Sequence, residues 1–258
     1  MIAERFLVWI AAAHLVVGLA CLAALRIDAG PIMGLHPAMK PMKFGLSIAL
    51  FLATMAVVLP ALSIASAHRR VIAAILAATM VVVMVPVLVQ AARGTTSHFN
   101  VRSSIDALVW RVMVGAIVIA TFTMGWVAVL ATVRPLIGPS GAPIDPLLAT
   151  AWRAGLWLFM LAAWSGFSMG GRLMHSVGGD DGGPGLAVLN WSAEHGDLRV
   201  SHFFALHVLQ ILPLVAVVLA RAPIGDSARW SALSFSIVAV TGVAIGTLLQ
   251  AFASRPVW

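Results

Sequence analysis

The sequence predicts an all-α integral membrane protein, a bundle of seven transmembrane helices. Each of seven apolar runs is long enough for the roughly 20 residues that cross a hydrocarbon core of about 30 Å. Hydrophobic residues make up 61% of the chain and charged residues 10%, which leaves too little polar surface to cover a soluble globule. No internal repeat or long polar linker separates the runs, so we expect one polytopic membrane domain over residues 1–258. The runs are 5–26, 44–65, 71–92, 107–131, 148–173, 201–221 and 230–252.

The basic charge of the chain fits a lipid surface better than nucleic acid. The formal net charge is +7, with sixteen Lys and Arg residues. Most of these residues stand at the ends of the apolar runs or in short loops, where they meet lipid headgroups. We therefore expect the lipid bilayer as a partner and no nucleic acid. The sequence does not specify an oligomeric state.

An odd number of spans puts the two ends of the chain on opposite sides of the membrane. Loops 27–43, 94–106 and 174–200 then share the side of the C-terminus, and this side carries most of the histidines. Lys and Arg residues are more numerous on the histidine-bearing side, which favours that side as cytoplasmic, but they are denser per loop residue on the other side, whose loops are short. The positive-inside rule is most reliable for short loops and so favours the other side as cytoplasmic. We expect a bacterial inner membrane protein with its histidine-rich face outside. The histidines of that face are His36, His98, His175, His195 and His202.

The first run contains a histidine and the only cysteine of the chain. One cysteine, Cys21, cannot form an internal disulfide, a CxxC redox pair or an iron–sulfur cluster. His14 lies in the middle of the run. It either donates a hydrogen bond to a neighbouring helix carbonyl or ligates a haem.

The loop after the first run has a repeating methionine and histidine pattern. Three methionines and one histidine recur every three residues, and two interleaved prolines favour an extended polyproline-like backbone that would align the four side chains on one edge. Thioether sulfur and imidazole nitrogen are soft ligands that suit Cu(I). The alternative is that the methionines pack the loop against the bundle. The series is Met33, His36, Met39 and Met42, and the prolines are Pro37 and Pro41.

The connection between the third and fourth runs is basic and rich in hydrogen-bonding side chains. Arg93, His98 and Asn100 stand together at a membrane boundary. Such groups suit an anionic headgroup, a haem propionate or a quinone oxygen. Hydroxyl groups in the same segment have a second explanation, because Ser103 or Ser104 could cap the next helix.

The connection before the sixth run is the densest in ionisable groups. Glu194, His195 and Asp197 could be metal ligands or could hold the second nitrogen of a coordinating imidazole. His175 and His202 lie on the same predicted face and complete this candidate metal set.

The sixth run carries a histidine inside the membrane, and such residues are functional candidates by default. His207 shares a helix face with Gln210, whereas His202 and His207 are five residues apart and diverge by about 140°. The latter two therefore do not form an HExxH or HxxxH zinc pair. His14 and His207 are the available in-span pair for a haem, although they lie about 18 Å and about 9 Å from the histidine face at 1.5 Å per residue.

Two main classes of function follow from these patterns. The first is a membrane oxidoreductase or electron-transfer protein that binds haem b or copper, with a quinone or another lipophilic small molecule as partner. The second is a transporter or amphiphile-binding protein whose histidines and arginines contact a solute. A metal-dependent lipid enzyme is a further alternative, so the sequence does not decide whether the protein is an enzyme.

Overall fold

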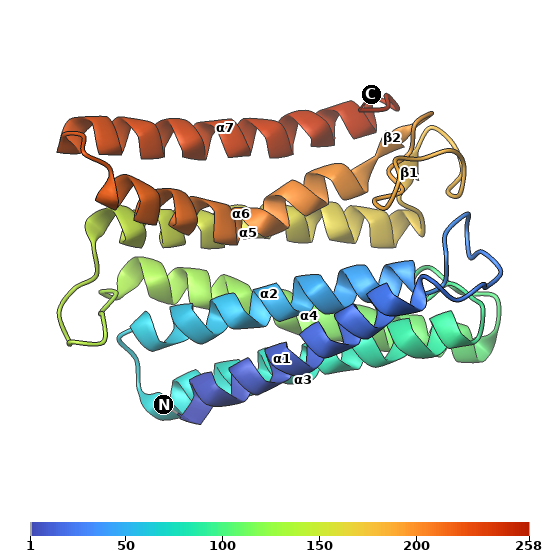
Figure 1. Cartoon of the computed structure of the whole chain (residues 1–258), viewed down its shortest axis with the longest axis horizontal. Coiled ribbons are helices and arrows are strands. Elements are labelled where there is room, and N and C mark those ends of the chain that lie inside the picture. The colour runs from blue at the N-terminus through green and yellow to red at the C-terminus, as the bar shows by residue number, and fades with distance from the viewer. Residues whose placement is uncertain (1, 258) are drawn as a thin grey trace. The chain divides into compact units, whose positions relative to one another are not determined.

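A computed structural model describes residues 2–257, and its regular structure is mainly α-helical (Figure 1). Within these residues, seven helices are long and apolar enough to cross a membrane. The predicted fold class, an all-α multi-pass membrane protein, is confirmed. The helices are α1 (Ile2–Ala24), α2 (Met39–Ala61), α3 (Ser66–Ala92), α4 (Ser104–Val133), α5 (Pro146–Arg172), α6 (Leu198–Arg221) and α7 (Asp226–Phe252).

Several helices extend beyond the apolar runs that predicted them. Helix α2 begins at Met39 and α3 at Ser66, each five residues before the predicted start. Apolarity marks the part of a helix that meets lipid, whereas backbone hydrogen bonding continues into the polar flanks. One consequence is a correction to the predicted loop 66–70, because His68 lies in the first turn of α3.

Contacts group the chain into two units, and the first contains α1, α2, α3 and the first part of α4 (residues 2–60, 64–123 and 187–190). Helices α1 and α2 approach closely at two glycines. A Cβ built on Gly45 would stand 2.8 Å from the Cα of Gly18 and 2.9 Å from the carbonyl oxygen of His14. The absence of side chains there lets the two backbones touch. Helices α3 and α4 bury an apolar cluster of Val83, Val87, Met113 and Ala116.

The second unit contains the end of α4, helices α5, α6 and α7, and a small hairpin (residues 61–63, 124–186 and 191–257). Strands β1 (Ser176–Val177) and β2 (Gly196–Asp197) pair antiparallel between α5 and α6. Gly155 of α5 fits against the backbone of Leu209 in α6, which brings these helices close. The buried cluster of this unit is Leu147, Ala151, Val208, Leu212, Ala216 and Leu233.

The expected polyproline conformation of the methionine loop is wrong. Ile32 and Leu35 pair across a tight turn in which Met33 and Gly34 have positive φ angles of 49° and 75°. Helix α2 then starts at Met39, so Met39 is helical while Met33 lies in the turn. Proline is tolerated in the first turn of a helix, where its missing N–H has no intrahelical acceptor. Pro41 therefore lies in the first turn of a helix instead of extending the loop.

Candidate functional site

Three histidines inside the candidate spans are anchored in the same way. The Nδ1 atom of His14 donates to the carbonyl oxygen of Ile10, at 2.8 Å. The Nδ1 atom of His207 donates to the carbonyl oxygen of Phe203, at 2.7 Å. In both cases the acceptor lies four residues back on the same helix.

The third, His202, is anchored across a helix interface. Its Nδ1 donates to the carbonyl oxygen of Ala162 in α5 at 2.8 Å and lies 3.1 Å from the hydroxyl of Ser165. Gly166 makes room for the ring, because a Cβ there would stand 3.1 Å from the His202 Cε1 atom. The imidazole of His202 is therefore held in a fitted position between α5 and α6.

This anchoring fixes the tautomer of all three rings. A carbonyl oxygen only accepts, so Nδ1 carries the proton and the neutral imidazole presents the lone pair of Nε2. Within the described part of the chain, Nε2 of His14, His202 and His207 makes no hydrogen bond. Metal-bound histidines use this arrangement, in which one nitrogen is held by a protein acceptor and the other faces the metal.

An aromatic cluster lies on one side of His207. The Phe203 ring centroid lies 4.2 Å from that of His207, and Trp191 and Phe204 pack against Phe203 at 5.6 and 5.7 Å. This cluster joins the loop before α6 to the first half of the helix. It offers planar apolar surface beside the imidazole.

His36 has the opposite hydrogen bonding. The backbone N–H of Ala38 donates to its Nδ1 at 3.1 Å, and its Nε2 donates to the carbonyl oxygen of Ile27 at 2.8 Å. Both nitrogens are thereby used to hold the turn that leads into α2. The predicted copper set of Met33, His36 and Met39 would need His36 to give up one of these bonds.

The connection between α3 and α4 contains a compact polar network. Nη1 of Arg93 donates to Gln90 at 2.5 Å and to Asp106 at 2.8 Å, and Gln90 donates to Asp106 at 2.8 Å. Ser103 donates to Asp106 and accepts from its backbone N–H, which confirms the predicted N-cap role of this serine. The sequence predicted a role for Arg93 and a helix cap at Ser103 or Ser104, but it did not predict that Gln90 belongs to the same polar network.

His98 and Asn100 have other partners. Asn100 is buried and bonds to Thr95 and Thr96, which shapes the loop from within. The His98 ring lies 5.2 Å from Phe44 and 5.4 Å from Trp110, between α2 and α4. These two residues therefore build the connection between α3 and α4.

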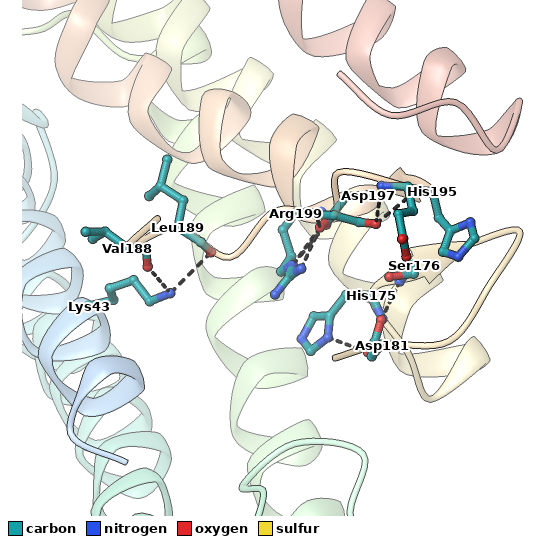
Figure 2. A network of polar contacts seen from close by, with 11 residues as sticks. Lys43, His175, Ser176, Asp181, Val188, Leu189, His195, Asp197 and Arg199 are labelled. Carbon is teal, nitrogen blue, oxygen red and sulfur yellow. Dashed lines mark hydrogen bonds and ion pairs between the residues drawn. The ribbon is translucent and has the colours of Figure 1, made fainter. Parts of the chain in front are cut away.

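The connection between α5 and α6 is organised around two carboxylates (Figure 2). Asp181 accepts from the ring of His175 at 2.7 Å and from the backbone N–H groups of His175 and Ser176. Burial raises the pKa of the Asp181 carboxyl, but the hydrogen bonds and charge of His175 and the bond from Ser176 lower it more, so it lies well below its usual range. The charged carboxylate thus closes the loop of residues 175–181.

Asp197 is the second carboxylate and also caps α6. It accepts from the backbone N–H groups of Ser192 and Arg199 and from the Arg199 guanidinium, at 2.5 to 3.1 Å. Figure 2 shows the His195 ring pointing away from His175. Glu194 is exposed and its carboxylate lies beside Gly183.

The described residues contain no group of three or more His, Cys, Asp or Glu side chains that could hold a metal ion. Two candidate metal residues of this connection are instead bonded to separate structural partners, His175 to Asp181 and Asp197 to Ser192 and Arg199. Sequence reasoning missed these partners, although the spacing of Asp181 six residues after His175 was a usable signal. Comparison with protein-family models, curated proteins and solved structures finds no match.

Proposed function

We propose that the protein binds haem b inside the membrane through histidine Nε2 atoms and acts as a membrane oxidoreductase or electron-transfer protein. The observation that carries the proposal is the shared anchoring of His14, His202 and His207. Each imidazole is oriented by a carbonyl acceptor at Nδ1, and in its neutral form it keeps an Nε2 lone pair in an apolar region. A polar atom without a partner in such a region costs free energy, and coordination to iron would supply the partner.

The geometry favours His207 over His202 as a ligand. His202 and His207 stand on one helix about 140° apart, so they cannot ligate the same iron. His202 is enclosed by α5, whereas the His207 ring lies against Phe203, whose side chain is 37% exposed. A flat aromatic surface beside an imidazole suits a planar macrocycle.

Haem is better supported than copper. A Cu(I) site in the methionine loop would need the thioethers on one edge and a nitrogen lone pair on His36, and the turn uses both His36 nitrogens. Copper binding there stays a prediction without a supporting contact.

An absorption spectrum of the protein purified in detergent tests the proposal. We expect a Soret band that shifts on reduction with dithionite, with haem in stoichiometric amount. His207→Ala is expected to abolish haem retention, because the ligand and its orienting hydrogen bond are both lost. His14→Ala should do the same if the haem is ligated by this residue as well.

His68→Ala is the matched control, because His68 lies in the first turn of α3 and outside the three anchored positions. Haem content per protein should be unchanged in this variant. Equal haem content in the His207 and His68 variants would contradict the assignment. A colourless protein that takes up haem neither during expression nor on reconstitution would reject haem binding and favour a transporter, and stoichiometric zinc would favour a metal-dependent lipid enzyme.

A further inference from the structure

The guanidinium of Arg93 is held along one side only. Both of its side-chain hydrogen bonds come from Nη1, to Gln90 and to Asp106. These two partners are themselves buried. Within the described part of the chain, Nε and Nη2 of Arg93 make no hydrogen bond, and the side chain is 47% exposed. The arginine is therefore oriented in advance and still presents two donors.

Two donors on one edge of a guanidinium match the oxygens of a phosphate group. Arginine binds phosphate through such parallel N–H bonds, and an arginine that is already oriented loses less entropy on binding. The charge around the site also favours an anion. Asp106 is the only acidic residue between positions 93 and 111, and its charge is balanced by Arg93. Arg102 and Arg111 are exposed and add positive charge.

The neighbouring surface is apolar. Ile105, Leu108 and Val112 follow the network on α4 at helical spacing and are 68%, 59% and 48% exposed. They share one side of the helix. A ligand with a phosphate and long hydrocarbon chains would meet charge at the start of α4 and apolar side chains further along it.

We infer that Arg93, with Arg102 from the same connection, forms a binding site for a phosphate group, supplied by the headgroup of an anionic phospholipid. The site does not depend on haem binding. His98 and Asn100 take no part in it, because their side chains build the loop.

Lipid titration of the full-length protein in detergent tests the site. Native mass spectrometry and the midpoint of thermal unfolding would be recorded with phosphatidylglycerol, phosphatidylcholine or inorganic phosphate. We expect phosphatidylglycerol to bind and to raise the midpoint of the wild-type protein, and the other two to do neither. Arg93→Lys should bind phosphatidylglycerol roughly tenfold more weakly, because lysine keeps the charge but loses the paired donors.

Arg102→Gln should weaken binding as well, and it leaves the bonds between Arg93 and Asp106 intact. Arg134→Gln is the control, because it removes an exposed arginine just beyond the other end of α4. Wild-type affinity for phosphatidylglycerol in both Arg93→Lys and Arg102→Gln would overturn the site. Equal affinity for inorganic phosphate would overturn the assignment to a lipid, and equal affinity for phosphatidylcholine would show that the net negative charge is not recognised.

Discussion

Single histidines of this chain differ chiefly in which nitrogen keeps a lone pair. A backbone carbonyl forces the proton onto Nδ1 in His14, His202 and His207, whereas a backbone N–H forces it onto Nε2 in His36. The first group can ligate a metal without rearrangement, and His36 cannot. The partner of each ring therefore separates candidate ligands from structural histidines.

The Asp181 carboxylate gives a pH prediction at the same scale. Asp181→Asn should destabilise the protein by about 1–3 kcal/mol near pH 7, because the ion pair with His175 is lost and the amide cannot accept all of the same bonds. The folded pKa of Asp181 is lowered, so its stabilisation is present above the unfolded value of about 3.9 and is lost only as the pH falls below it. Thermal unfolding in detergent from pH 7 to pH 3 measures the difference.

The difference between wild type and Asp181→Asn should be present at pH 5 and should shrink toward pH 3. Asp180→Asn is the control, because Asp180 is the exposed neighbour in the same loop. A variant difference that grows from pH 5 to pH 3 would contradict this linkage.

At the scale of elements, the contact between α1 and α2 depends on Gly18 and Gly45. Gly45→Ala should push the helices apart and cost about 1–3 kcal/mol of stability, because the new Cβ would meet the backbone of α1. The carbonyl oxygen of His14 is among the atoms that it would meet. We therefore also expect altered haem content or a shifted Soret band, if His14 is a ligand.

Gly115→Ala in α4 is the matched control for this substitution. No atom lies within 4 Å of a Cβ built at Gly115, so alanine there should be neutral or stabilise the helix by up to about 1 kcal/mol. Thermal unfolding of both variants in the same detergent makes the comparison. Similar midpoints for the two variants would show that α1 and α2 are not in tight contact.

At the scale of the whole molecule, the seven helices predict opposite sides for the two ends of the chain. Reporter domains fused before α1 and after α7 should report different compartments. The predicted orientation places the end after α7 outside, with the loops that carry His36, His98 and His175. If both reporters lie in the same compartment, the alternation of seven spans is wrong, and the loops that carry these histidines need not share one side of the membrane.

Much of the site lay beyond sequence reasoning for a physical reason. The in-span position of His14 and His207 is visible in the sequence, and so is the cap at Ser103. The contact of His202 with Ala162 joins residues forty positions apart and exists only once α5 and α6 pack. Contacts of this kind depend on side-chain fit, which periodicity does not encode.

The sequence by itself determined the class of the protein and the number of its spans. Apolar runs of sufficient length must form helices in a bilayer, because lipid offers no hydrogen bonds to the backbone. Tertiary structure alone decided which polar groups keep donors or acceptors that could bind a ligand. Packing brought Arg93 to Gln90 and Asp106, bonded Asp181 to His175, and engaged both nitrogens of His36 in hydrogen bonds. Each of these bonds requires atoms from separate turns or helices to meet within about 3 Å.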